Sequence, residues 1–167
     1  NALNGSDLMI NITNDNDIDT EAPILTSFQI DDNTLSSGEH ASITFNAVDD
    51  NDIGGLSATF KSVDDTGNMF FIEFSETPTL NSDGSYTLLS SPISDNAYAG
   101  DYTFYYSLSN LGIRIWDEYD NDTYYNRSSN TDALESAINN SEMTINVTNV
   151  NEIDTTAPVL TSFQIDN

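Results

Sequence analysis

Apolar and polar residues alternate along most of the chain, and clusters of Gly, Asn and Asp separate the alternating runs. A period of two residues places successive side chains on opposite faces of a β-strand. The pattern therefore predicts an all-β protein of seven strands. Their expected inward positions are Ile24, Thr26, Phe28 and Ile30; Ala41, Ile43, Phe45 and Ala47; Leu56, Ala58 and Phe60; Phe70, Ile72 and Phe74; Tyr86 and Leu88; Tyr102, Phe104, Tyr106, Leu108, Ile113 and Ile115; and Met143, Ile145 and Val147.

The sixth of these strands is unusually long and passes Gly112, where the sequence predicts a bulge. Helix is scarce. Residues 131–138 read as one short helical insert before the last strand, with Thr131 or Asp132 at its N-cap. Seven antiparallel strands with one helical insert predict an immunoglobulin-like β-sandwich.

One segment of the chain occurs twice. Residues 1–32 recur at 136–167 with a constant offset, so that the run from Ala22 to Asp31 reappears with a single change, Ile24 against Val159. The offset is far longer than the roughly 20 to 50 residues of solenoid repeats, so each unit is expected to bury its own core. We expect the chain to come from a longer tandem array and to divide into the end of a preceding repeat with its linker (1–22), a complete repeat (23–153) and the first strand of the next repeat (154–167).

The charge and apolar content of the chain limit the kinds of partner that it can bind. The chain has a net charge of −25, with 28 acidic residues against three Lys and Arg, while 37% of its residues are hydrophobic. Such a charge excludes a nucleic-acid partner and disfavours anionic membrane surfaces, whereas the apolar content is sufficient for a folded core. Cys is absent and the apolar runs are too short to span a bilayer. We expect no membrane insertion and no obligate oligomer.

The acidic residues concentrate in three turns, at residues 14–19, 49–54 and 117–122. If each strand reverses the direction of its predecessor, all three turns lie at the same pole of the sandwich. Carboxylates crowded in this way need a cation, and short oxygen ligands suit Ca²⁺, while the lack of Cys and the single imidazole of His40 disfavour zinc. The predicted ligands are Asp15, Asn16, Asp17 and Asp19; Asp49, Asp50 and Asp52; Asp117, Asp120 and Asp122; and, in the second linker, Asn151, Glu152 and Asp154. The alternative is that these turns are acid-rich and simply solvated.

Several short motifs carry a family resemblance. They are the Asp-Thr-x-Ala-Pro segment at 19–23 and its copy at 154–158, the Val48-Asp49-Asp50 run that ends in Gly54 and Gly55, Ala-Tyr-Ala-Gly-Asp-Tyr-Thr at 97–103, and Asp117 followed by Asp120 and Asn121. With them the chain resembles the immunoglobulin-like extender repeats of very large bacterial surface adhesins, the RTX type exported by type I secretion. Its linker is similar to the Asp- and Asn-rich linkers of cadherins. The resemblance implies an extracellular, cell-surface location, adjacent repeats of the same chain as partners, and calcium between successive domains.

Two features depart from that family. Its repeats carry Asp-x-Ala-Gly-Asn after the sixth strand, whereas residues 117–121 here read Asp-Glu-Tyr-Asp-Asn and lack the Gly. The insert at 127–140 is also longer than a plain hairpin needs.

Three functions compete at this stage. The first is a calcium-rigidified spacer in a rod that projects a distal binding region. The second is a carbohydrate- or surface-binding module, suggested by the aromatic residues Tyr98, Tyr105, Trp116, Tyr119, Tyr124 and Tyr125, although packing is the commoner use of such side chains. An enzyme is disfavoured, because His40 has no nucleophile motif beside it and no phosphate loop or dinucleotide fingerprint is present.

Overall fold

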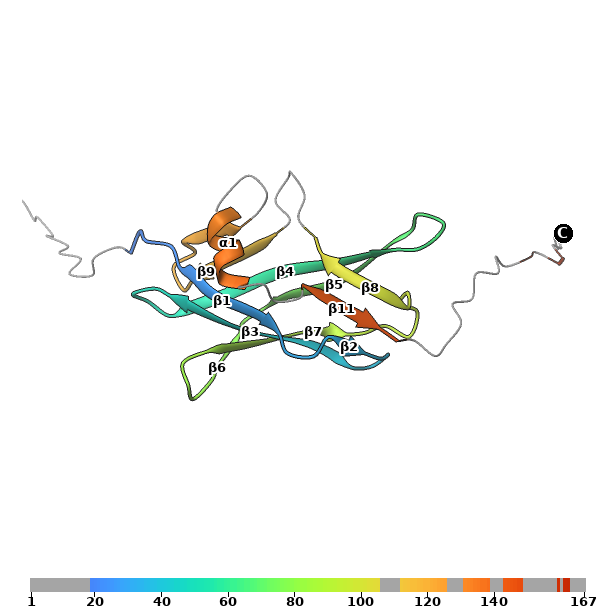
Figure 1. Cartoon of the computed structure of the whole chain (residues 1–167), viewed down its shortest axis with the longest axis horizontal. Helices are drawn as coiled ribbons and strands as arrows, with labels where there is room; N and C mark the ends of the chain where they lie inside the picture. The colour runs from blue at the N-terminus through green and yellow to red at the C-terminus, as the bar shows by residue number, and fades with distance from the viewer. Residues whose placement is uncertain are drawn as a thin grey trace, which may run out of the picture.

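The structure is a computed structural model that describes residues 19–105, 112–125, 131–138, 143–148, 159 and 161–162. Two β-sheets with one short helix make up a sandwich-like arrangement (Figure 1). The predicted linker ligands Asp15, Asn16, Asp17, Asn151, Glu152 and Asp154 lie outside the described residues, as do the expected core positions Tyr106 and Leu108.

The first sheet has four strands in the order β1-β3-β7-β6, and every pair in it is antiparallel. β1 and β6 are its edges. The strands are β1 (Ile24–Ile30), β3 (His40–Val48), β7 (Tyr86–Pro92) and β6 (Thr79–Leu80).

The second sheet has the order β10-β9-β4-β8-β11-β2, and β5 pairs with β4 beside that path. β2 runs parallel to β11, so this sheet is mixed and the expectation of seven strands, all antiparallel, is not met. The described residues hold eleven strands because short pieces without a clear alternation, such as β2, β6 and β10, also pair. The strands of the second sheet are β2 (Thr34–Leu35), β4 (Ile53–Val63), β5 (Met69–Glu76), β8 (Gly100–Phe104), β9 (Ile113–Asp117), β10 (Asp122–Tyr125) and β11 (Thr144–Val147).

The expected long sixth strand is interrupted. β8 and β9 lie one after the other along the edge of β4 that β5 does not occupy, since Phe60 pairs with both Ile72 and Phe104 while Leu56 pairs with both Glu76 and Ile115. β8 ends at Phe104, after which the amide of Tyr105 still donates to the carbonyl of Thr59, and β9 begins at Ile113. Residues 106–111 lie outside the described residues, so the predicted bulge at Gly112 stays a prediction.

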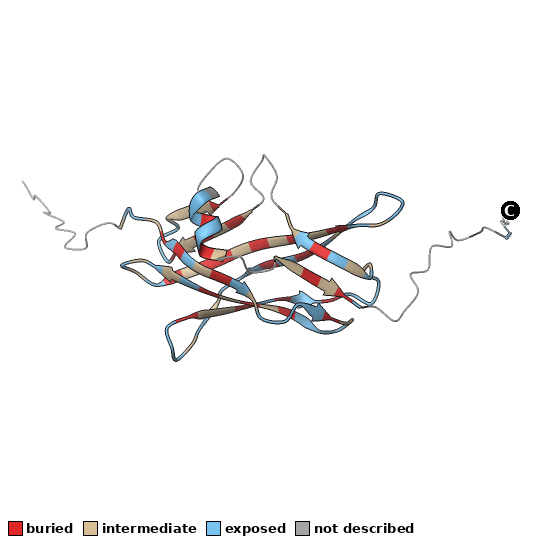
Figure 2. Ribbon diagram, viewed as in Figure 1, coloured by how far each residue is buried: buried red, intermediate tan, exposed pale blue. Residues whose placement is uncertain are grey.

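The core lies between the sheets, and buried positions alternate along the strands (Figure 2). The predicted inward residues Phe28, Ala41, Ile43, Phe45, Leu56, Ala58, Phe60, Ile72, Phe74, Leu88, Tyr102, Ile113, Ile115, Ile145 and Val147 are all buried. Phe60 contacts Phe74 and Phe104 edge to face, with ring centroids 5.9 and 5.7 Å away. Burial of such side chains, at about 1.5–3 kcal/mol each, is the main stabilising contribution.

The prediction for β1 is wrong at its start. Ile24 is 58% exposed and Thr26 is exposed, whereas Leu25 is 3% exposed. The register between β1 and β3 shifts between Leu25 and Ser27, and such a β-bulge changes which side chains face the core. The alternation of residues 24–30 carries no sign of this shift.

The predicted helix is confirmed as α1 (Thr131–Ile138). Asp132 lies in the first turn of α1. The residues just before Thr131 lie outside the described residues, so the predicted N-cap stays a prediction. Leu134 and Ala137 are buried, and the helix packs against β1. Among the described residues, no helix combines the length and apolar character needed to cross a membrane.

Candidate metal centre

Three carboxylates from three separate segments meet at one end of the sandwich. Asp19 precedes β1, Asp49 follows β3, and Asp117 ends β9. One carboxylate oxygen of each lies within 4.8 Å of the others. We call these residues the acidic triad, and the end of the sandwich that holds them the acidic pole. Each of them comes from a different one of the three acidic turns in the sequence.

Strand pairing explains why the three meet. Ile24, at the start of β1, pairs with Val48, so that Asp49 is the next residue along β3 after the pairing ends. The chain then crosses from the first sheet to the second, and Ile53, which opens β4, pairs with Asp117. The triad therefore lies where the chain crosses from β3 to β4, beside the segment that leads into β1.

Two glycines in β4 allow β9 to approach closely. A Cβ atom built on Gly54 would lie 2.2 Å from the carbonyl oxygen of Asp117, and one on Gly55 would lie 2.1 Å from a ring carbon of Trp116. The register between β4 and β9 also shifts between Ile53 and Gly55. Side chains at these two positions would push Asp117 away from β4, so the Gly-Gly pair is a local requirement of the site.

Asp117 is 1% exposed and organises the turn that follows it. Its Oδ1 accepts the amide N–H groups of Tyr119 (2.7 Å) and Asn121 (2.9 Å), while its Oδ2 accepts the side-chain amide of Asn121 (2.8 Å). Asp120 has φ 65°, in the left-handed region that Gly favours and that Asp tolerates better than most residues. Asp120 thus supplies a left-handed conformation at the fourth position of the turn, where no Gly is present.

Two asparagines connect the triad, and neither is among the ligands predicted from the sequence. Asn51 donates from its side chain to Oδ2 of Asp19 (2.8 Å) and from its amide N–H to Oδ1 of Asp49 (2.9 Å). Asn121 donates to Oδ2 and to the backbone carbonyl of Asp19, both at 3.3 Å, as well as to Asp117. Both residues lie inside the acidic turns, and this position is the only feature of the sequence that could have indicated their role.

The pKa values of Asp49 and Asp117 shift in opposite directions. Burial raises the pKa of Asp49, and the charges of Asp117, Asp19 and Asp50 add to the rise against the opposing hydrogen bond from Asn51. Burial would also raise the pKa of Asp117, but the hydrogen bonds from Asn121 and Tyr119 outweigh it and hold that pKa below its usual value. Hydrogen bonds from its own turn thus lower the pKa of Asp117, while burial and the neighbouring carboxylates raise the pKa of Asp49.

The donor set fits a hard divalent cation. It offers carboxylate oxygens, and the amides of Asn51 and Asn121 carry carbonyl oxygens that become available when the side chain rotates. His40 begins β3, whereas Asp49 follows the end of that strand, and Nδ1 of His40 lies 2.7 Å from the carbonyl oxygen of Ser90. No imidazole or thiolate of the described residues therefore reaches the triad, as a zinc site would require.

The other predicted ligands among the described residues are not members of the triad. Asp122 pairs with Arg114, with its Oδ2 2.8 Å from Nε, and so has a partner of its own. Asp50, Asp52 and Asp120 are exposed. Asp50 accepts a hydrogen bond from Asn51 (3.2 Å), and Asp52 contributes its backbone carbonyl to the amide of Glu118 (3.1 Å). Each acidic turn thus supplies one carboxylate to the triad.

Most of the candidate aromatic residues pack within the molecule. Tyr125 is buried, Tyr98 stacks on Phe70 with ring centroids 5.5 Å apart, and Trp116 lies against Gly55. The guanidinium of Arg114 lies 4.8 Å from the ring of Trp116 and 5.7 Å from that of Tyr124, and Lys61 lies 4.7 Å from the ring of Tyr105. Tyr119 is exposed. These contacts favour a packing role over an aromatic platform.

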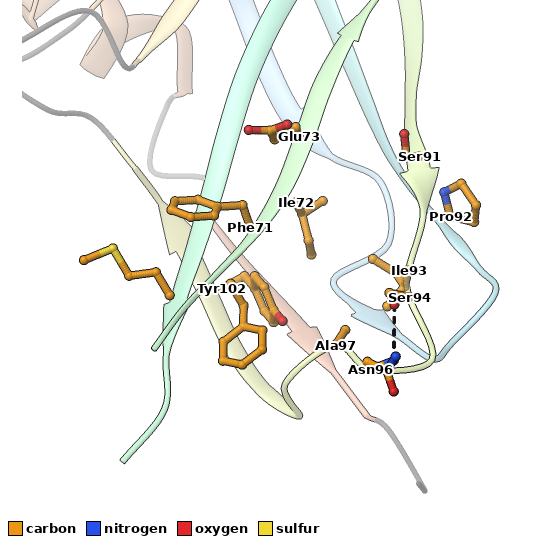
Figure 3. A pocket seen from close by; sticks show the side chains of 12 residues that line it. Phe71, Ile72, Glu73, Ser91, Pro92, Ile93, Ser94, Asn96, Ala97 and Tyr102 are labelled. Atoms are coloured by element: carbon orange, nitrogen blue, oxygen red, sulfur yellow. Dashed lines mark hydrogen bonds between the residues drawn. The ribbon is translucent and has the colours of Figure 1, made fainter. Parts of the chain in front are cut away.

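A pocket of about 460 Å³ lies in the other half of the sandwich (Figure 3). One wall is the Met69–Glu73 part of β5, which pairs with the end of β4 farthest from the triad. The other wall is the end of β7 with the residues that follow it as far as Ala97. Phe71, Ile72, Pro92 and Tyr102 contribute apolar surface, and Glu73 and Asn96 contribute polar groups. This pocket and the triad are separate features.

Comparisons of the chain with protein-family models, with curated proteins and with solved structures found no match. Function is therefore inferred from the acidic triad, its hydrogen bonds and its place between the segment that precedes β1 and the body of the sandwich.

Proposed function

We propose that this protein is a calcium-rigidified spacer module of a tandem-repeat surface adhesin. The observation that carries the proposal is the convergence of Asp19, which lies in the Asp-Thr-x-Ala-Pro segment before β1, with Asp49 and Asp117 from the body of the sandwich. These oxygens come from both the linker and the domain. A single bound ion would therefore fix the linker relative to the domain.

Each residue has a distinct part in this mechanism. Asp49 and Asp117 bind from the body of the domain, Asp19 binds from the linker, and Asn51 and Asn121 hold Asp19 in reach of both. Calcium would supply the positive charge that offsets the repulsion among the carboxylates. Without it, the described part of the linker, from Asp19 to Pro23, would be held by its hydrogen bonds and by the packing of the buried Pro23.

The direction of the chain supports a spacer. β1 begins at the acidic pole, and β11 leaves the sandwich at the opposite end (Figure 1). Units joined in this way extend end to end, and a fixed joint at each acidic pole would convert a flexible string into a rod. The adjacent repeats of the same chain are then its partners, outside the cell.

The strand order supports the finer assignment to an immunoglobulin-like fold. The β1-β3-β7-β6 order corresponds to the A-B-E-D sheet of such sandwiches, while β4 with β8 and β9 and with β11 corresponds to the C-F-G sheet. In this assignment β10 and α1 are an insertion before the last strand.

The spacer proposal is tested on a tandem array of three or more units, measured in calcium and in chelator. Because calcium binds only the folded state, it should raise the melting temperature; a concentration of 100 times Kd stabilises by about 2.7 kcal/mol. Small-angle scattering should give a greater maximum dimension in calcium than in chelator. Substitution of Asp19 by Asn in every unit should weaken both effects, so that more calcium is needed to reach them. Equal length and equal melting temperature in the two conditions would contradict the proposal.

The pocket beside β5 is the one observation that favours a second function, a carbohydrate-binding module. Its mixed apolar and polar lining is typical of small-ligand sites. A glycan array read in calcium tests this function, and specific binding that is lost on substitution of Phe71 by Ala would support it.

A further inference from the structure

Tyr125 makes a buried hydrogen bond that ties the two sheets together at the acidic pole. Its side chain is 1% exposed, and its hydroxyl oxygen accepts the amide N–H of Leu25 at 2.7 Å. Leu25 belongs to β1, an edge of the first sheet, and Tyr125 belongs to β10, an edge of the second. The bond thus joins two edge strands that no β-ladder connects.

The bond lies where the chain arrives at the sandwich. Leu25 is at the register shift of β1, and only a short stretch with the buried Pro23 separates it from Asp19. On the other side, β10 pairs with β9, and the turn between them contains Asp117 and Asn121. A displacement of β1 from β10 would therefore move Asp19 relative to both residues.

α1 reinforces the same junction. Its buried residues Leu134 and Ala137 face the core, and the helix contacts both β1 and β10. The spacer function by itself assigns no role to β10 and α1. Together they form a clamp on the first strand, at the end of the molecule that holds the acidic triad (Figure 1).

We infer that Tyr125 is a positioning residue for the acidic triad, which holds β1 through Leu25 so that Asp19 lies beside Asp49 and Asp117 before any ion arrives. This inference rests on the proposed calcium site. It assigns the β10 and α1 insertion a role in calcium affinity, because a metal site binds tightly only when the supporting residues hold its ligands in place.

The test is Tyr125→Phe, which removes only the hydroxyl, with Tyr102→Phe as a matched control. Tyr102 is also 1% exposed, and its hydroxyl donates to the backbone carbonyl of Tyr98 at 3.1 Å, next to the pocket and away from the triad. Calcium affinity is measured by isothermal titration calorimetry, and near-ultraviolet circular dichroism verifies the fold of both variants. Supporting residues of metal sites typically contribute about 10- to 100-fold in affinity, so we expect Tyr125→Phe to weaken calcium binding by about tenfold or more. The affinity of Tyr102→Phe should equal that of the wild type.

A double-mutant cycle separates positioning from a general loss of stability. If Tyr125 acts through Asp19, Tyr125→Phe should have little further effect on calcium affinity in a protein that already carries Asp19→Asn. Additive losses in the double variant would overturn the inference, as would unchanged affinity in Tyr125→Phe or equal losses in Tyr125→Phe and Tyr102→Phe. Absence of calcium binding by the wild type is a different result, because it would refute the calcium site itself.

Discussion

The two turns that flank β4 are both rich in Asp and Asn, but they use their carboxylates differently. In the turn after β4, Oδ1 of Asp64 accepts hydrogen bonds from Thr66 (amide N–H 2.9 Å, hydroxyl 2.7 Å) and from the amide of Asn68 (2.8 Å), and Oδ2 accepts the side-chain amide of Asn68 (2.8 Å). Desolvation alone would raise the pKa of Asp64, but these hydrogen bonds lower it to about 2. This carboxylate is satisfied entirely within its own turn.

In the turn before β4, Asp49 instead faces carboxylates from two other segments, and burial together with their charges raises its pKa. The two turns read alike in sequence. What distinguishes them is convergence: the carboxylate of Asp64 meets only hydrogen-bond donors of its own turn, whereas Asp49 lies beside carboxylates from two other segments of the chain. An acid-rich turn becomes a candidate calcium site only through the fold that brings others to it.

The largest expected effect is on calcium affinity. Asp117→Asn keeps an oxygen for the amides of Tyr119 and Asn121 but removes a charged ligand, whereas Asp64→Asn makes the same change in the other turn. Outer-shell changes alone weaken metal binding by about 10- to 100-fold, so the loss of Asp117 should cost at least about 100-fold in affinity. Asp64→Asn should leave calcium affinity unchanged. Calorimetric titration of both variants checks this, and equal losses would remove the distinction between the two turns.

A second effect concerns the approach of β9 to β4. Gly55→Ala places a methyl group against the ring of Trp116, and overpacking of this kind costs about 1–3 kcal/mol. Chemical denaturation should show that loss in the free energy of unfolding. Gly55→Ala combined with Trp116→Ala should cost less than the two single losses together, because the smaller side chain relieves the contact. Strict additivity would mean that the two residues do not press on each other.

A third effect has opposite signs in the presence and absence of calcium. Because the folded pKa of Asp49 lies above its unfolded value, the stability linked to this group is complete below the unfolded pKa and is lost as pH rises through the folded pKa. At pH 7, without calcium, its charge therefore opposes folding. Asp49→Asn should raise the melting temperature in chelator and lower it in saturating calcium. A change of the same sign in both solutions would contradict the assignment of Asp49 as a ligand.

The smallest expected effect is the pH dependence of the stability that Asp64 contributes. The folded pKa of Asp64, about 2, lies below its ordinary value of 3.8, so its contribution to stability is present above 3.8 and is lost as pH falls through about 2. The difference in melting temperature between wild type and Asp64→Asn should be constant above about pH 5 and fade towards pH 2. A difference independent of pH would show that the charge of Asp64 contributes nothing.

The sequence predicts the fold well wherever a strand is long and buried on one face. β3 and β4 have the expected inward residues, because their alternation continues unbroken through Ala41, Ile43 and Phe45 and through Leu56, Ala58 and Phe60. It fails where the register shifts. The bulge between Leu25 and Ser27 leaves no trace in the composition of β1, and two-residue strands such as β2 are too short to show a period.

The sequence predicted where the candidate site lies, but not which residues form it. Strand parity alone indicated that the three acidic turns share a pole, and Asp19, Asp49 and Asp117 do meet. Strand parity does not say which carboxylate of each turn joins the triad. In the third turn, Asp122 forms an ion pair with Arg114, and Asp120 adopts a left-handed backbone conformation, so Asp117 is the residue that joins. The bridging roles of Asn51 and Asn121 depend on side-chain hydrogen bonds that no periodicity reports.

The central claim is that one cation joins the linker to the sandwich at the acidic triad. A crystal structure at high resolution, from crystals grown in calcium, measures this most directly. We predict ion density bounded by carboxylate oxygens of Asp19, Asp49 and Asp117, at the distances of about 2.3–2.6 Å typical of calcium, and no such density in the turn of Asp64. The claim would be contradicted if crystals grown in saturating calcium showed no ion at the triad while the three carboxylates still lay within 4.8 Å of one another.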